Sequence, residues 1–116
     1  MSKKEVRQRF RDSVFSRDKY RCRVCNAIPP KVGEVDDCDF WWLDAHHITN
    51  RNDMPNGGYV LENGITLCPG CHMMAELTLS AISQGDSFKE SWHPKYLYQL
   101  IGSSYEKAVA ASERLR

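Results

Sequence analysis

The chain has 116 residues, 41% of them hydrophobic, and a formal net charge of +1. This length corresponds to one domain, and the hydrophobic fraction is low for a core that supports several long loops without a structural metal. No run of about 18 or more apolar residues occurs, which argues against a membrane span. Because the charged residues 1–7 are not followed by the apolar segment of a secretory signal, we expect a cytoplasmic protein.

The N-terminal segment is predicted to be a basic helix. Apolar side chains recur every four residues at Val6, Phe10 and Val14, after a Ser-x-x-Glu capping box, so residues 3–17 should form an amphipathic helix that packs on the core. Residues 1–25 contain nine Lys or Arg and three acids, so positive charge is concentrated here. A solvated helix face would explain this charge, and so would contacts with phosphates.

Five cysteines are present, and four of them form two Cys-x-x-Cys pairs. In a cytoplasmic chain thiols stay reduced, and a two-residue spacing lets both sulfurs of a pair reach one tetrahedral ion. A four-thiolate Zn²⁺ site is therefore favoured over disulfides. The 42 residues between the pairs leave room for a catalytic hairpin. The expected zinc ligands are Cys22, Cys25, Cys68 and Cys71, and Cys38 is left as a free thiol.

The middle of the chain has the pattern of a hairpin. Residues 26–39 should form an exposed loop, because they contain prolines, a glycine and acids whose spacing fits no calcium site. The aromatic run 40–43 suits a first strand, with Asp44 and two histidines at its end. The polar residues 49–59 are then the connecting loop.

The expected return strand and one helix follow this loop. The chain should return through residues 59–62 and 65–67, with a tight irregularity at 63–64. A helix should start near Pro69, since proline is tolerated in a first turn, and continue to about residue 83.

The C-terminal part offers less chemistry. His93 stands alone before a proline, which is more typical of a surface or structural residue than of a metal ligand. Residues 95–101 suggest a short helix, and Ser103 with Glu106 forms a capping-box pattern that should open a last helix. These helices are expected to cover the core or bind a partner.

The other three histidines lie close to residues that can hold a metal. Neighbours on a strand point to opposite faces, and a pair that leaves a strand into a loop can diverge by about a right angle. In either case His46 and His47 should have different tasks, one as a metal ligand and one as a free base. His72 directly follows Cys71, so a zinc ion held there would fix its position. His72 could instead replace a cysteine as a zinc ligand, although four cysteines already fill a tetrahedral site.

The order His-His, Asn, His with interleaved cysteine pairs resembles the HNH endonuclease family, including its small phage-type members. The resemblance covers about residues 10–76. It rests on residues 10–25, which are similar to the family's lead-in, 44–48 to its first strand, 57–58 to its connecting loop and 67–72 to its helix entry.

This resemblance implies an α+β fold, with a small ββα-metal core and a structural zinc between N-terminal and C-terminal helices. Residues 1–116 would be a single nuclease domain. Its core would span about residues 10–83, and a helical extension would span about 94–116.

The resemblance also implies a one-metal hydrolysis of DNA phosphodiester bonds. His47 matches the general base, and a neutral imidazole can accept a proton at physiological pH. His46 and His72 match ligands of a catalytic divalent ion, Mg²⁺ or another such as Mn²⁺. Asn63 matches the asparagine that pins the loop and orients His47.

Two acidic residues have open roles in this scheme. Asp44 could orient a histidine or join the metal's shell. Glu76 stands where some relatives have another histidine, four residues after His72, so the two share a helix face. Glu76 is thus either a third ligand or merely exposed, and exposure is slightly favoured.

DNA is the expected partner. The resemblance implies a DNA nuclease, and the basic residues of the N-terminal segment could contact the DNA phosphates. One rival interpretation is a zinc-stabilised DNA-binding module without catalysis, which leaves His46, His47 and Asn63 unexplained. Another is a zinc domain that binds RNA or protein, but the sequence lacks the alternating aromatic and basic residues of single-strand binders. The candidate DNA contacts are Arg7, Arg9, Arg11, Arg21, Arg23 and Arg51.

Overall fold

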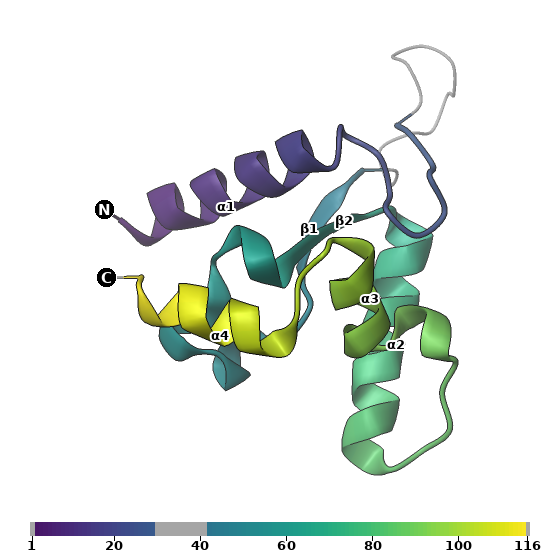
Figure 1. Cartoon of the computed structure of the whole chain (residues 1–116). Helices are drawn as coiled ribbons and strands as arrows, with labels where there is room; N and C mark the ends of the chain where they lie inside the picture. Colours follow the sequence, from purple (N-terminus) through teal and green to yellow (C-terminus); the bar gives the residue numbers. More distant parts are fainter. Residues whose placement is uncertain (1, 30–41, 116) are drawn as a thin grey trace.

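The computed structural model describes residues 2–29 and 42–115 (Figure 1). Within these residues, four α-helices and several short 3-10 turns surround a two-stranded antiparallel sheet, which confirms the expected α+β class. Most of the expected loop at 26–39, the aromatic residues at 40 and 41, and Cys38 lie outside the described residues. No helix in the described part of the chain is long and apolar enough to cross a membrane.

The N-terminal helix α1 spans Lys3–Arg17, as the sequence predicts. The Ser2 hydroxyl accepts a hydrogen bond from the Glu5 amide at 3.1 Å, which satisfies an otherwise unpaired donor of the first turn. Phe10 and Val14 are buried. Figure 1 shows α1 above the hairpin, so the apolar stripe of the helix packs onto the sheet.

The hairpin consists of β1 (Asp44–His47) and β2 (Gly64–Leu67), with His46 opposite Ile65 and His47 opposite Gly64. The expectation that the aromatic run forms the first strand is wrong for its described residues, because Trp42 and Leu43 precede the strand. The physical reason is the length of the partner strand. β2 ends at Leu67, opposite Asp44, and α2 begins two residues later, so Trp42 and Leu43 have no strand partner opposite them.

The return of the chain also differs from the expectation. Leu61–Asn63 forms a 3-10 turn, and Gly64 belongs to the strand instead of to an irregularity. A Cβ atom at Gly64 would lie 2.8 Å from the Phe10 ring and would also collide with Val14. The glycine therefore lets α1 lie directly on the backbone of β2.

A buried carboxylate joins the segment after α1 to the sheet. Asp18 is 2% exposed, and it accepts hydrogen bonds from the Thr66 amide at 2.9 Å and from Arg17 at 2.8 Å. The Arg23 amide donates to the Thr66 carbonyl at 3.0 Å. These partners satisfy the buried Asp18 carboxylate, and together with the Arg23 amide it ties the segment that carries the first cysteine pair to β2.

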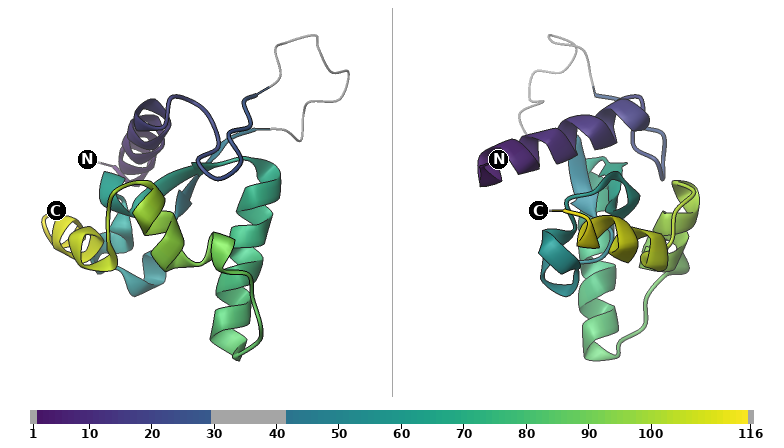
Figure 2. Two further views of the ribbon diagram at one scale, coloured as in Figure 1. Left: turned by 45° about the vertical axis from the view of Figure 1, so that its right-hand side comes forward. Right: turned by 60° about the vertical axis from the view of Figure 1, so that its left-hand side comes forward.

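Helix α2 spans Pro69–Gln84, within one residue of the predicted end. Cys68 is its N-cap, and Gly85 ends it with a φ of 74°, a left-handed conformation that favours glycine. Figure 2 shows α2 leaving the end of the hairpin, so the strands and this helix form the expected ββα unit.

The C-terminal extension forms α3 (Pro94–Leu100) and α4 (Tyr105–Glu113). The expected capping serine is wrong by one residue. Ser104 accepts from the Lys107 amide at 3.1 Å, whereas the Ser103 hydroxyl donates to the Glu62 carbonyl at 2.9 Å. Ser103 is thus engaged by the segment before β2, which leaves its neighbour to cap the helix.

The connecting loop is held by the extension. It contains the 3-10 turns Arg51–Asp53 and Pro55–Gly58, and α4 packs against the second of these (Figure 1). The Asn56 amide donates to the carbonyls of Ser112 and Leu115, both at 2.9 Å. The loop that the sequence presents as polar and turn-rich is therefore folded against a helix.

Candidate functional site

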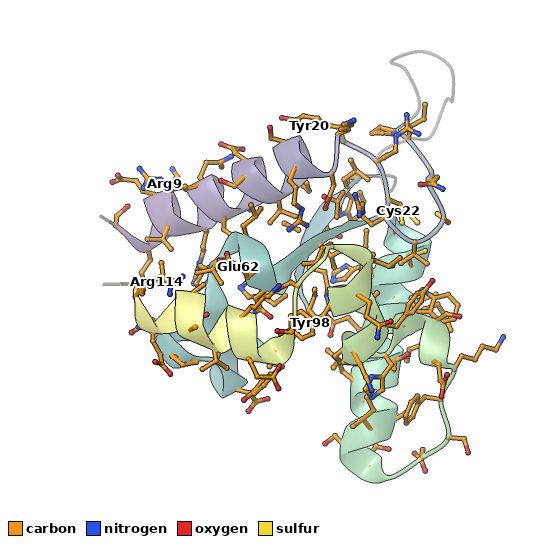
Figure 3. The ribbon with its side chains drawn as sticks, in the orientation of Figure 1. Arg9, Tyr20, Cys22, Glu62, Tyr98 and Arg114 are labelled. Carbon is orange, nitrogen blue, oxygen red and sulfur yellow. The ribbon has the colours of Figure 1, made fainter. Side chains whose placement is uncertain are left out.

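The two cysteine pairs come together at the start of α2. Their four sulfurs all lie within 4.8 Å of one another, and those of Cys25 and Cys68 are 3.6 Å apart. This separation is far longer than a disulfide bond, and the four thiols are free. The distance between these two sulfurs is close to the sulfur–sulfur distance in a ZnS₄ tetrahedron with Zn–S bonds of about 2.3 Å. Figure 3 labels Cys22 where the segment after α1 approaches α2.

The electrostatics of this cluster also favour a cation. Burial raises the pKa of the Cys71 thiol, and neighbouring sulfur charge raises it further. Four thiolates at this separation repel one another unless a positive ion lies between them. The donor set fits Zn²⁺, and a tetrahedral site filled by four cysteines leaves no open position, as in structural zinc sites.

The second cluster lies between β1 and α2. His46 is 3% exposed, and its Nδ1 is 3.4 Å from Glu76 Oε1. His72 Nε2 approaches the same oxygen at 3.3 Å. One donor atom from each of the three residues lies within 4.8 Å of the others, so the group could hold a metal ion.

The outcome for Glu76 is therefore mixed. Its side chain is 57% exposed, as favoured from the sequence, yet its carboxylate also contacts both histidines. A hydrogen bond with His46 lowers the pKa of this carboxyl, which keeps it charged. His72 lies in this group and not among the cysteines, so the alternative of His72 as a zinc ligand finds no support.

Asp44 contacts the opposite side of the His72 ring. Its Oδ2 lies 3.0 Å from His72 Nδ1, and this hydrogen bond raises the pKa of His72. A carboxylate that holds one ring nitrogen turns the other toward the cluster, as carboxylates do behind metal-bound histidines. Of the two open roles for Asp44, the geometry fits orientation of a histidine.

His47 faces away from this cluster, as alternation along β1 requires. Its ring stacks on Phe10 with centroids 4.5 Å apart and meets the Tyr59 ring edge-on at 4.7 Å. Burial, followed by the charges of His46 and Arg51, lowers the pKa of His47 to about 4. The imidazole is therefore neutral at physiological pH. Its Nε2 has no hydrogen-bond partner in the part of the chain that is described.

Two neighbouring cavities lie beside β1 and share part of their lining. A cavity of about 230 Å³ is lined by the residues of the second cluster, and another of about 220 Å³ is lined by Arg7, Arg11 and Tyr59. Both are lined by Ala45, His47 and Arg51. We call the two cavities together the β1 groove.

The structure separates the six candidate arginines. Arg7, Arg11 and Arg51 line the β1 groove, whereas the other three do not. The Arg23 side chain has partners elsewhere in the fold, because it donates to the Leu100 carbonyl and lies 3.8 Å from Asp18. Figure 3 labels Arg9 on α1.

Asn63 holds the connecting loop. Its amide nitrogen donates to the carbonyls of Thr49 and Gly58 at 3.0 and 3.2 Å, and its oxygen accepts from the Thr49 amide at 3.0 Å. Its own carbonyl accepts from the Ile48 amide at 2.9 Å. Asn63 is thus linked to His47 through the backbone of Ile48 and Thr49, the two residues that follow His47.

His93 and Tyr98 of the C-terminal extension differ in their relation to the site. His93 caps α3 by accepting from the Lys95 amide at 3.1 Å, which is a structural role. Tyr98 is buried and donates to Asn63 Oδ1 at 2.7 Å. Sequence reasoning missed Tyr98, because a tyrosine in a short helix carries no motif.

The fold and the two clusters define a small α+β domain of the ββα type that could hold two metal ions. Residues 39–76 match the family model described as HNH endonuclease, and this segment is thus an HNH endonuclease domain. The family is one of metal-binding nucleases, which act on nucleic acid. Comparisons with curated proteins and with solved structures gave no match.

Proposed function

We propose that this protein is a DNA endonuclease that hydrolyses phosphodiester bonds with one divalent ion. The observation that carries the proposal is the arrangement across β1. A group that could hold a metal lies on one face, a neutral histidine lies on the other, and both line one groove. Hydrolysis needs both a positive charge at the phosphate and a base for the attacking water.

His46, His72 and Glu76 would hold the divalent ion, Mg²⁺ or Mn²⁺, in the β1 groove. Bound there, the ion would supply positive charge to the scissile phosphate and the leaving oxygen. Asp44 orients His72. The four cysteines would hold a structural Zn²⁺, which fixes the start of α2 and with it the position of His72.

His47 is the proposed general base. It would take a proton from the attacking water, since its imidazole is neutral and is held between Phe10 and Tyr59. Arg51 lines both cavities, and its positive charge disfavours imidazolium in the free protein. A bound phosphate would offset the charge of Arg51 and make His47 a better base. Asn63 keeps the loop after His47 in place.

The location and domain organisation are also proposals. Reduced Cys-x-x-Cys pairs suit a cytoplasmic protein. Residues 1–116 are proposed to act as one domain, because Asn56 and Asn63 in the HNH segment are hydrogen-bonded to the C-terminal extension.

Incubation of supercoiled plasmid with the purified protein tests the proposed activity. Nicked or linear product should appear with Mg²⁺ or Mn²⁺ and disappear with a chelator that removes the divalent ion. DNA retardation without product at any concentration of these ions would instead favour the zinc-stabilised binding module. Cleavage of a matched RNA but not of the DNA would contradict the proposed substrate.

The arginines of the β1 groove should contribute directly to DNA affinity. Arg7→Gln and Arg11→Gln should each weaken binding at all sequences and reduce the slope of log K against log salt by about 0.9, the value for one phosphate contact. Arg9→Gln is the matched control, because it removes the same charge from the same helix outside the groove. Fluorescence anisotropy over a range of salt concentrations measures both quantities.

The comparison among the three arginine variants decides the interpretation. An equal loss with Arg9→Gln would mean that only the net charge of α1 matters. Unchanged slopes with Arg7→Gln and Arg11→Gln would mean that these side chains do not contact phosphates in the complex.

A further inference from the structure

The C-terminal extension reaches the HNH site through one side chain. Tyr98 lies in α3, outside the segment that matches the HNH family, and is 3% exposed. Its hydroxyl is 2.7 Å from Asn63 Oδ1 and 2.7 Å from Thr49 Oγ1. Figure 3 shows Tyr98 on the side of α3 that faces the hairpin.

The direction of these hydrogen bonds follows from the available protons. Asn63 Oδ1 can only accept, so the phenolic proton of Tyr98 goes to it. The Tyr98 oxygen must then accept from the Thr49 hydroxyl. Asn63 Oδ1 also accepts from the Thr49 amide at 3.0 Å, which closes a network of three residues. Buried networks of this kind hold one geometry when every member is satisfied.

This network holds the backbone next to the proposed general base. Thr49 is two residues after His47, and both its amide and its carbonyl are bonded to the Asn63 side chain. The amide of Ile48, between them, donates to the Asn63 carbonyl. Rotation of the Asn63 side-chain amide would therefore break both of its hydrogen bonds to Thr49, two residues after His47.

We propose that Tyr98 is a positioning residue of the nuclease site. Its hydroxyl fixes the Asn63 amide, and through Asn63 it fixes the backbone after His47, so full turnover depends on the C-terminal extension. This inference rests on the proposed nuclease function. Other contacts between the extension and the HNH segment hold the surrounding backbone, such as the hydrogen bond from Ser103 to the Glu62 carbonyl, but Tyr98 is the residue of the described extension that bonds the Asn63 side chain.

Tyr98→Phe tests the proposal, because it removes the hydroxyl and keeps the ring. We expect kcat to fall roughly 3- to 10-fold, as for the loss of one hydrogen bond, with unchanged KM for DNA and unchanged half-saturating Mg²⁺. Tyr96→Phe is the matched control, since it removes a hydroxyl from a side chain that is 42% exposed on the same helix. Its kcat should equal that of the wild type.

A second measurement does not depend on cleavage. In zinc-loaded protein without the catalytic ion, NMR should show faster hydrogen exchange of the Thr49 amide in Tyr98→Phe, together with shifted Asn63 side-chain NH₂ signals. The Ile65 amide in β2 should keep its exchange rate, which separates a local change from general loosening. Tyr96→Phe should leave all of these signals unchanged.

The outcomes distinguish the inference from the proposed function. Wild-type kcat in Tyr98→Phe, or a loss that appears in KM or metal affinity instead, would overturn the positioning role. If the wild-type protein cuts no DNA, the proposed function fails, and unchanged Thr49 exchange would separately overturn the link from Tyr98 to Asn63. Slower turnover together with faster Thr49 exchange would support the proposal.

Discussion

Replacement of His47 by alanine should lower DNA cleavage by about two to four orders of magnitude, the usual contribution of a general base. Binding of the divalent ion and of DNA should persist. The reason is geometric, because His47 faces Phe10 and Tyr59, whereas the proposed ligands lie on the other face of β1. Single-turnover cleavage and calorimetric titration with Mn²⁺ measure the two properties separately.

Variants of the proposed ligands should behave in the opposite way. With His46→Ala or His72→Ala, cleavage should be lost at low concentrations of divalent ion and partly recovered at high concentrations. Glu76→Gln should show a weaker form of the same behaviour if its carboxylate is a third ligand. His93→Gln is the control, because this histidine caps α3 and does not line the β1 groove.

Metal titrations of cleavage decide between the two roles. Recovery of His47→Ala by added Mg²⁺ or Mn²⁺, with no recovery of His46→Ala, would show that the base and the ligand are assigned the wrong way round. The structural zinc should remain at full occupancy in all these variants, since none of them alters a cysteine.

Replacement of Cys68 by serine should unfold the protein. Binding of a structural zinc contributes about 10–16 kcal/mol in small zinc domains, which matches or exceeds the total stability of about 5–15 kcal/mol of an ordinary domain. Cys68 also caps α2, because its sulfur accepts from the Cys71 amide at 3.5 Å. The wild type should contain one tightly bound zinc per chain, and Cys68→Ser should lose both the zinc and the cooperative thermal transition.

Cys38→Ser is the matched control for this experiment, because the sequence predicts a free thiol outside both Cys-x-x-Cys pairs. It should keep one zinc per chain and the wild-type melting temperature. A well-folded Cys68→Ser protein without zinc would contradict the structural role of the cluster. Elemental analysis and circular dichroism provide the two measurements.

The local features of this protein could be predicted from its sequence. The helix Lys3–Arg17 has the predicted bounds, because the Ser2 cap and the spacing of Phe10 and Val14 involve residues within a few positions of one another. The same holds for Pro69–Gln84, with a proline in its first turn and Gly85 after its end. The Cys-x-x-Cys spacing likewise predicted which sulfurs could share an ion.

The sequence also indicated that the two adjacent histidines point in different directions. Both lie in β1, where they occupy opposite faces, and this separation follows from backbone geometry alone. The family resemblance placed the first strand correctly at about residues 44–48, whereas the aromatic run misplaced its start, because the start depends on the partner strand. Residues 44–47 pair with Gly64–Leu67, and the aromatic residues before them do not.

Tertiary structure decided the features that join distant segments. It brought His46 to the His72–Glu76 pair of α2, placed Arg7 and Arg11 beside His47 while leaving Arg9 outside the groove, and put the hydroxyl of Tyr98 on Asn63. It also required glycine at position 64, where α1 crosses β2. The sequence determined the residues available for chemistry and their local geometry. Their partners depended on how the helices pack around the hairpin, because such contacts leave no periodic or short-range signal in the chain.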